Sequence, residues 1–324
     1  MGPELRHLRY LIAVAEHGNF TRAAEELRIS QPTLSQQIKQ LERAVGVQLL
    51  DRSGRGVRPT DAGTAYVHYA RRALRELAAA DRAVLDVADL SRGHLRLALT
   101  PTFTAYLVGP LVRALHTHHP GITLDLREMT QDRMEASLLA DELDLGIAFA
   151  GTHLPGIAAT DLFTEPLGLV VGAHRAGTRG ERPLPVRELA DQQLALLSAD
   201  FITRSHIDEY FVRHRIDPPI AVEANTIQAL TEIVRRTAPL ATVLPLAVTD
   251  DDPHLGTIPV DPPLPTRVAT LLRRGSGYES AAAHAFTALV HDLVRTRGYT
   301  PPDPRRTAER SAESGRRVMR ESST

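Results

Sequence analysis

The segment from residue 20 to residue 42, FTRAAEELRISQPTLSQQIKQLE, constrains the fold of this chain more than any other stretch. Its pattern of apolar and polar residues predicts two short helices joined by a turn. We expect Thr21 to cap the first helix and Ser30 to cap the second. Pro32 suits the first helical turn, where the backbone N–H lacks a helical partner in any case. Such a pair is typical of helix-turn-helix DNA-binding domains, although small helix pairs also occur on the surface of ordinary domains.

The second helix of this pair has two contrasting faces. Leu34, Ile38 and Leu41 recur at intervals of four and three residues, so we expect them on one buried face. The opposite face is rich in amides and hydroxyls, which donate to and accept from base edges, and it carries a cation that suits phosphate. The residues expected in a DNA major groove are Gln31, Pro32, Thr33, Ser35, Gln36 and Lys39.

Residues 47–58 predict a β-hairpin, or wing, whose tip is rich in arginine. The first 60 residues hold nine basic and six acidic side chains, although the formal net charge of the whole chain is −1. The positive balance therefore lies beside the helix pair, as expected for a surface that faces phosphates. An exposed loop without DNA contacts is the alternative. The residues expected at the DNA backbone or minor groove are Arg22, Arg52, Arg55 and Arg58, and Thr21 is also expected to be a DNA-binding residue.

A long helix is predicted to begin at a cap formed by Asp61 and to run to about Asp89. Seven apolar residues within it alternate at spacings of four and three, which is a heptad seam. A helix this long needs a partner for its seam, so we expect a dimerisation helix; packing against its own domain is the alternative. The seam residues are Tyr66, Ala70, Ala73, Leu77, Ala80, Val84 and Val87.

The remainder of the chain alternates strands with helices, which predicts an α/β domain with a largely parallel sheet. One of the expected helices spans residues 103–118. Two similar runs suggest two lobes, with chain crossings near residues 161–163 and 265–267. The predicted boundaries are residues 1–60 for a winged helix-turn-helix, 61–90 for the linker helix, 92–298 for a ligand-binding domain and 299–324 for a disordered tail. Lobe I comprises residues 92–162 and 267–298, and lobe II comprises residues 163–266.

Ligands of open parallel sheets collect beyond the carboxyl ends of the strands. Hydroxyl and amide side chains follow several of these predicted ends, at the starts of helices, where free N–H groups favour a small anion. Each such residue alone is more often only a helix cap, and Arg204 either adds charge or points to solvent. The candidate effector residues are Thr100, Thr102, Thr130, Phe149, Ser198, Thr203, Asn225 and Thr226.

Several classes of chemistry find no support in the sequence. Cysteine is absent, which excludes disulfides, thiolate metal ligands and thiol-based redox sensing, and Lys39 is the single lysine. His116, His118 and His119 are more typical of a helix end than of a metal site. Asp141, Glu142 and Asp144 are likewise more typical of a solvated helix end than of an acid–base pair. The spacing suggests no nucleophile–base set, so we expect no enzyme, no metal and no cofactor. Without a signal-peptide pattern or a membrane-length apolar run, we expect a cytoplasmic protein and no membrane partner.

The head motif at residues 19–42 and the wing sequence LLDRSGRGVRPTDAG at residues 49–63 resemble those of LysR-type transcriptional regulators. The resemblance extends from residue 5 to about residue 298. It implies a winged helix-turn-helix, a long linker helix and a two-lobed, Rossmann-like effector domain of the periplasmic-binding-protein type. It also implies a homodimer or homotetramer on a two-fold symmetric DNA operator, an effector that alters DNA bending, and contact with RNA polymerase.

Four stretches of the second domain are most similar to the cyanate-responsive members of this family, and they lie at residues 100–111, 128–150, 196–210 and 222–237. This similarity implies a transcriptional activator that responds to cyanate, a small linear anion. The residues themselves indicate only a small anion or carboxylate. A cytoplasmic solute-binding protein, or an enzyme that uses the same two-lobed fold without a DNA role, is the alternative from another functional class.

Overall fold

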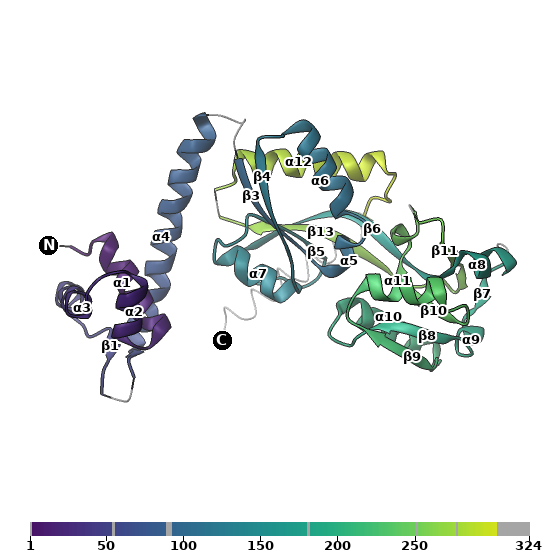
Figure 1. Ribbon diagram of the computed structural model, residues 1–324, viewed down its shortest axis with the longest axis horizontal. Coiled ribbons are helices and arrows are strands. Elements are labelled where there is room, and N and C mark those ends of the chain that lie inside the picture. Colours follow the sequence, from purple (N-terminus) through teal and green to yellow (C-terminus); the bar gives the residue numbers. More distant parts are fainter. Residues whose placement is uncertain are drawn as a thin grey trace, which may run out of the picture. The chain divides into compact units, whose positions relative to one another are not determined.

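A computed structural model of the protein describes residues 2–53, 56–88, 93–179, 182–250, 252–276 and 278–302. The chain forms two compact units, Met1–Ala88 and Asp89–Thr324 (Figure 1). None of the helices within the described ranges combines the length and the apolar character needed to span a bilayer.

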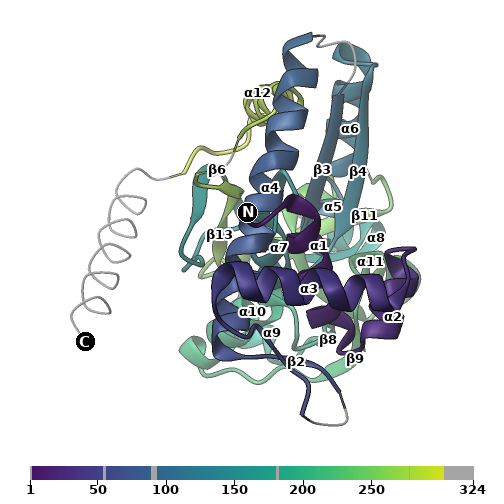
Figure 2. The ribbon, with the colours of Figure 1, turned by 90° about the vertical axis from the view of Figure 1, so that its left-hand side faces the viewer.

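The N-terminal unit is a bundle of three short helices with a hairpin and a long final helix (Figure 2). Buried side chains of the first and third helices, among them Leu11, Val14, Leu34, Ile38 and Leu41, form its core. This burial confirms the predicted apolar face. The elements are α1 Leu5–His17, α2 Phe20–Glu26, α3 Gln31–Val45, β1 Leu50–Asp51, β2 Arg58–Pro59 and α4 Asp61–Ala88.

Of the three helix caps predicted in this unit, one is confirmed and two are wrong. The Ser30 hydroxyl accepts from the Thr33 N–H, as expected for the cap of α3. The cap of α2 is Asn19 rather than Thr21, because the Asn19 carboxamide oxygen lies 2.7 Å from the Thr21 nitrogen and thereby starts the helix at Phe20.

The long helix α4 is capped by Thr60, whose hydroxyl accepts from the Gly63 N–H at 3.0 Å, so the prediction of Asp61 as the cap is wrong. Gly63 stands where a capping-box glutamate would otherwise fit. A Cβ atom at this position would lie 1.8 Å from the Leu49 carbonyl oxygen. The close approach of α4 to the chain before the hairpin therefore requires glycine here.

The predicted seam of α4 divides into two parts. Tyr66 packs against the core of its own unit and Ala70 is buried, so the alternative of packing within the domain applies to these two residues. Farther along, Ala73, Leu77 and Ala80 are exposed, and Leu77 retains 43% of its accessible surface. The side chains of Val84 and Val87 lie outside the described residues.

The C-terminal unit is built on a nine-stranded mixed sheet in the order β4-β3-β5-β13-β6-β10-β8-β9, with β11 paired to β6. Strands β3, β4 and β5 are mutually parallel, as are β8, β9 and β10, whereas β6 and β13 run antiparallel to their neighbours. The strands of this sheet are β3 Gly93–Leu99, β4 Ile122–Glu128, β5 Leu145–Phe149, β6 Ile157–Gly172, β8 Gln193–Leu197, β9 Ile220–Ala224, β10 Leu240–Pro245, β11 Leu255–Ile258 and β13 Thr266–Arg274.

Helices cover both faces of this sheet in each of two lobes, which confirms the predicted two-lobed fold (Figure 1). In lobe I, α6 and α12 pack on one face and α7 on the other; in lobe II, α10 and α11 take opposite faces. The helices are α5 Pro101–Thr104, α6 Val108–His118, α7 Gln131–Leu139, α8 Ala173–Arg179, α9 Val186–Leu189, α10 Ile202–His214, α11 Ile227–Arg236 and α12 Ala281–Thr296, with a short 3-10 turn at Leu246–Val248 and a β7–β12 pair at Leu184–Pro185 and Val260–Asp261.

The strand β6 carries the chain from one lobe to the other without a break. It pairs with β13 as far as Pro166 and with β10 from Leu167 onward. The first crossing therefore lies a few residues beyond the predicted position at 161–163, because a continuous apolar strand gives no sequence signal for a change of partner. The Leu167 N–H donates to the Pro265 carbonyl at 3.1 Å, which joins the two crossings.

Two other predictions are corrected by the C-terminal unit. The single helix expected at residues 103–118 is two helices, α5 and α6. The predicted tail does not begin at residue 299: the Tyr299 ring stacks on Phe163 with centroids 4.6 Å apart, and the Thr164 N–H donates to the Thr300 carbonyl at 2.8 Å. Residues 303–324, the rest of the predicted tail, lie outside the described residues.

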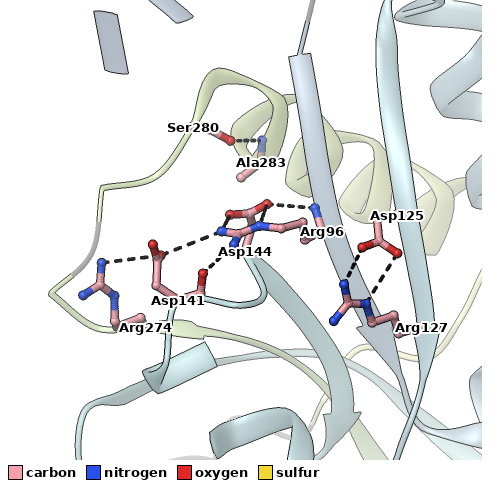
Figure 3. A network of polar contacts seen from close by, with 8 residues as sticks. All are labelled: Arg96, Asp125, Arg127, Asp141, Asp144, Arg274, Ser280 and Ala283. Atoms are coloured by element: carbon pink, nitrogen blue, oxygen red, sulfur yellow. Dashed lines mark hydrogen bonds and ion pairs between the residues drawn. The ribbon is translucent and has the colours of Figure 1, made fainter. Parts of the chain in front are cut away.

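A polar network fixes the turn between α7 and β5 to the sheet of lobe I (Figure 3). Arg96 on β3 contacts Asp144 through its guanidinium at 2.6 Å and through its backbone N–H at 2.7 Å. Asp141 lies 3.8 Å from Arg96 and 3.7 Å from Arg274 on β13. The sequence suggested a solvated helix end at Asp141 and Asp144, but both side chains are largely buried in ion pairs that hold the lobe together.

Candidate functional site

The outer face of α3 carries the polar side chains that the sequence placed there. Gln31, Pro32, Thr33, Gln36 and Lys39 are exposed, and Ser35 is half-buried. Leu34, Ile38 and Leu41 anchor the opposite face in the core, so the polar side cannot rotate inward without loss of that burial. The arrangement presents hydrogen-bonding groups along one rigid helix, with the Thr33 hydroxyl already 2.7 Å from that of Ser30.

The predicted backbone-binding arginines differ in how freely they can act. Arg22 and Arg58 are exposed. Arg52 instead donates to Glu42 at 3.1 Å, and its guanidinium carbon lies 4.9 Å from the centre of the Phe20 ring. The Glu42 carboxylate also accepts from the backbone of the residues before the hairpin, so Arg52 braces β1 against α3 rather than reaching outward. Arg55 lies outside the described residues.

A cavity of about 460 Å³ opens between the two lobes of the C-terminal unit. It is bounded by the starts of three helices and by the chain that leaves β5, all at the carboxyl ends of parallel strands. The lining residues are Thr100, Pro101 and Thr102 before and within α5, Thr130, Gln131 and Asp132 at α7, Phe149, Ala150, Gly151 and Thr152 after β5, and Asp200, Phe201, Ile202, Ser205 and His206 at α10.

The candidate effector residues of lobe I all line this cavity, whereas those of lobe II do not. Thr100, Thr102, Thr130 and Phe149 face it. Thr203 is fully buried behind the lining, with its hydroxyl oxygen 3.3 Å from that of Thr102. The lobe II wall of the cavity is formed instead by the chain between β8 and α10 and by the first turns of α10. The lobe II candidates predicted from the sequence are not among these lining residues.

The other three lobe II candidates occupy different surroundings. The Ser198 N–H donates to the Ala224 carbonyl and Asn225 is exposed. Thr226 caps α11 and lines a second cavity of about 530 Å³. Arg204 donates to Asp208, Glu223 and the Leu197 carbonyl, each at 2.8 Å, so its charge is satisfied within lobe II. The cavity residues from Asp200 to His206 were missed, and only their position after a predicted strand could have signalled them.

Hydrogen-bond donors face the cavity from both lobes. The Thr100 hydroxyl is buried and has no hydrogen-bond partner among the described residues. Thr130 precedes α7 without capping it, and Phe201 precedes α10 without a side chain that could cap. No side chain therefore caps either helix, and the N–H groups of their first residues lie at the cavity from opposite lobes.

A buried network of hydrogen bonds around Glu135 holds the loop that lines the cavity after β5. Glu135 on α7 lies 2.8 Å from the His153 ring nitrogen Nδ1 and accepts from the Leu154 N–H at 2.7 Å. The Gln131 side chain donates to the same carboxylate at 3.1 Å and accepts from the Phe149 N–H at 3.3 Å. These contacts set the position of Phe149 and of the loop before any ligand arrives.

A second buried cluster, absent from the sequence predictions, lies behind the cavity where the lobes join. Arg267 on β13 is ion-paired to Glu165 on β6, and both side chains are at most 2% exposed. The Arg267 guanidinium also donates to the Thr203 hydroxyl and stacks over the Phe149 ring, 4.0 Å from its centre. The Tyr106 hydroxyl donates to Glu165. Burial and the adjacent Glu165 carboxylate raise the pKa of Tyr106 well above its usual value, so Tyr106 remains a donor.

Comparison with known proteins assigns both units. The family model described as "LysR substrate binding domain" matches residues 88–295, and that described as "Bacterial regulatory helix-turn-helix protein, lysR family" matches residues 5–64. The nitrogen assimilation regulatory protein nac of Klebsiella aerogenes is 33% identical over 244 residues, covering 74% of this chain and 78% of the relative. The DNA-binding transcriptional dual regulator OxyR of Escherichia coli strain K12 is 30% identical over 272 residues, covering 83% and 89%.

Solved structures share this fold. A full-length OxyR variant from Pseudomonas aeruginosa superposes with a TM-score of 0.66 at 24% identity, covering 94% of this chain and 100% of that one. Full-length CbnR, solved with its target DNA, gives a TM-score of 0.53 at 27% identity, covering 90% and 99%. The two units together therefore define a DNA-binding transcriptional regulator with an effector domain, and not an enzyme. The chain belongs to the LysR family.

Proposed function

We propose that this regulator activates transcription when a small anion, cyanate or a small carboxylate, binds in the cavity between the lobes. The observation that carries the proposal is the buried Thr100 hydroxyl, which has no hydrogen-bond partner among the described residues, beside the N–H groups at the uncapped start of α7. A buried polar group without a hydrogen bond is unfavourable, and an acceptor in the cavity would remove that cost. The two acidic lining residues, Asp132 and Asp200, are exposed to solvent and so oppose an anion only weakly.

The size of the cavity limits where a small anion would sit. A volume of about 460 Å³ lies within the usual range for ligand sites. Cyanate has only three heavy atoms and would fill a small part of it. It would therefore bind at the lobe I wall, against Thr100 and Thr102, and leave the remaining space to water or to closure of lobe II. A larger carboxylate would fill more of the cavity with the same wall contacts.

We favour ligand binding over redox chemistry as the signal that this regulator detects. Several relatives are named as hydrogen peroxide-inducible genes activators. The 324 residues of this chain contain no cysteine, so oxidation of a thiol cannot be the signal that it detects. A bound anion changes the lobes only if it prefers one arrangement of them, and an anion held between facing helix starts would favour the closed arrangement.

For the operator, we propose that the outer face of α3 lies in the major groove, with Gln31, Gln36 and Lys39 at base edges and phosphates. Their exposure on a helix anchored from behind supports this role. Arg22 and Arg58 would hold the DNA backbone. The exposed part of the α4 seam, at Ala73, Leu77 and Ala80, would join two chains into a homodimer, or two dimers into a tetramer, on a two-fold symmetric site. RNA polymerase is the expected partner of an activator bound beside a promoter.

The test is titration calorimetry of the full chain with sodium cyanate, azide, formate, acetate and benzoate in matched salt. We expect saturable binding of at least one small anion and a large loss of affinity in Thr100→Val. Heats that stay at the dilution level for every anion would overturn the small-anion assignment. Binding that is unchanged in Thr100→Val would place the anion away from the lobe I wall.

A further inference from the structure

The buried cluster behind the cavity has a feature that the proposed effector site does not use. Arg267 lies outside the cavity lining, yet two of its neighbours, Thr203 and Phe149, join it to the lining wall. Thr203 contacts Arg267 on one side, and its hydroxyl oxygen lies 3.3 Å from that of Thr102 on the other. A continuous chain of polar contacts therefore leads from a buried guanidinium to a side chain that faces the cavity.

The direction of the hydrogen bonds in this chain follows from the chemistry of its members. A guanidinium has only donors, so the Thr203 oxygen must accept from Arg267. The Thr203 side chain is fully buried, and its hydroxyl proton needs an acceptor. The Thr102 oxygen is the remaining partner of this hydroxyl, so Thr203 donates to Thr102. The Thr102 proton is then left to point elsewhere, and Thr102 lines the cavity.

We propose that Arg267 determines the preference of the cavity for anions, although it does not touch the ligand. Its positive charge acts through Thr203 and Thr102, whose hydroxyl protons are aligned so that the wall presents a donor to the cavity. Hydrogen bonds that begin at a charged donor are stronger than neutral ones, and successive bonds polarise one another. The inference rests on the proposed function, and it names Arg267 as the positioning residue of that site.

Glu165 opposes Arg267 in this arrangement. It pairs with the Arg267 guanidinium and also accepts from the Tyr106 hydroxyl, so its negative charge is shared between two donors. Both charges are buried, where solvent screens them little. The balance between Arg267 and Glu165 therefore sets how much positive potential reaches Thr102. Loss of the Glu165 charge should make the cavity more attractive to an anion.

The first test removes the Thr203 hydroxyl in Thr203→Val and measures cyanate and acetate binding by calorimetry. We expect affinity for the anion that binds the native chain to fall roughly tenfold, the effect of one lost charge-assisted hydrogen bond. Thr203→Ser retains the hydroxyl and should restore native affinity. Thr242→Val is a matched control, because Thr242 is also fully buried in lobe II and its hydroxyl has no partner among the described residues. This control should bind like the native chain.

The second test depends on the direction in which anion affinity changes, because a purely structural contact would not raise that affinity when it is lost. Glu165→Gln keeps the shape of the side chain and removes its charge. If Arg267 supplies the potential, anion affinity should rise by about threefold even though an ion pair has been lost. If the cluster only supports the fold, affinity should fall or stay constant while thermal stability falls.

The outcomes separate this inference from the proposed function. If the native chain binds cyanate or acetate and Thr203→Val binds it equally well, Arg267 is not coupled to the cavity and only the further inference fails. Affinity that falls in Glu165→Gln would overturn it in the same way. If the native chain binds neither anion nor any other in the panel, both proposals fail together.

Discussion

The face of α3 and the cavity between the lobes hold their functional groups in opposite ways. On α3, every polar candidate belongs to one continuous helix and is exposed or partly exposed, while a single apolar stripe anchors the helix from behind. At the cavity, the groups come from three helix starts, a strand end and a buried cluster that spans two lobes. The first site is therefore set by local periodicity, whereas the second exists only after distant segments have paired.

This contrast predicts that buried long-range contacts tolerate substitution least. Arg267→Met leaves the Glu165 carboxylate buried without its cation, so we expect a loss of about 3–5 kcal/mol in the free energy of unfolding. The measurement is urea denaturation of the full chain. Arg267→Met combined with Glu165→Gln removes both charges and should recover part of this loss. A loss of less than about 1 kcal/mol in the single variant would show that the pair is not essential to the fold.

The next largest loss of stability is expected from disruption of a backbone contact in the N-terminal unit. Gly63→Ala would place a Cβ atom 1.8 Å from the Leu49 carbonyl oxygen, so α4 would have to move, and we expect a loss of about 3 kcal/mol. Thermal unfolding and DNA affinity should both decline. Gly109→Ala in α6 is the control, because nothing lies within 4 Å of its added Cβ and alanine favours helix by about 0.5–1 kcal/mol. Equal stability of the two variants would contradict the tight packing of α4.

The exposed face of α3 should respond without any change in fold. Gln36→Ala should reduce discrimination between the operator and random DNA by about 1–3 kcal/mol, because an amide that contacts a base edge is lost. Arg58→Ala should weaken binding to all sequences alike and lower the salt dependence by about one phosphate contact. Gel shifts at several salt concentrations measure both effects. Equal losses on specific and random DNA in both variants would argue against these separate roles.

The smallest effect on stability is expected at the cavity wall. Thr100→Val removes a buried hydroxyl that has no partner among the described residues, so the free energy of unfolding should stay within about 0.5 kcal/mol or rise slightly. Cyanate affinity should nevertheless fall by about tenfold, because the ligand loses its hydrogen-bond donor. Thermal shift with and without ligand distinguishes the two quantities. A clear drop in stability without ligand would mean that the Thr100 hydroxyl already has a structural partner.

Much of the fold follows from patterns within short stretches of sequence. The spacing of Leu34, Ile38 and Leu41 predicted the buried face of α3, and Ser30 and Pro32 predicted its first turn. Alternating strands and helices predicted the two lobes. The cap at Asn19 was missed because Thr21 has a suitable hydroxyl and only the geometry of the turn decides between the two. The break between α5 and α6 lacked a comparable sequence signal.

Only the lobe I lining of the cavity could be predicted, because only there do the lining residues follow a clear local pattern. Thr100, Thr102, Thr130 and Phe149 directly follow or end strands whose positions were clear, and all four line it. Lobe II contributes a different segment, because the chain after β8 and the first turns of α10 bring Asp200, Phe201, Ile202, Ser205 and His206 to the wall. The Arg267–Glu165 pair joins residues 102 positions apart, and no local pattern marks such a contact.

The most direct test of the account is a footprint of the full chain on the DNA upstream of its own gene, measured with and without sodium cyanate in matched salt. We expect protection of a two-fold symmetric site whose length or bend-sensitive cleavage changes with cyanate, and no such change for Thr100→Val. An identical footprint with and without cyanate, under conditions where calorimetry detects the bound anion, would contradict the link between the cavity and DNA.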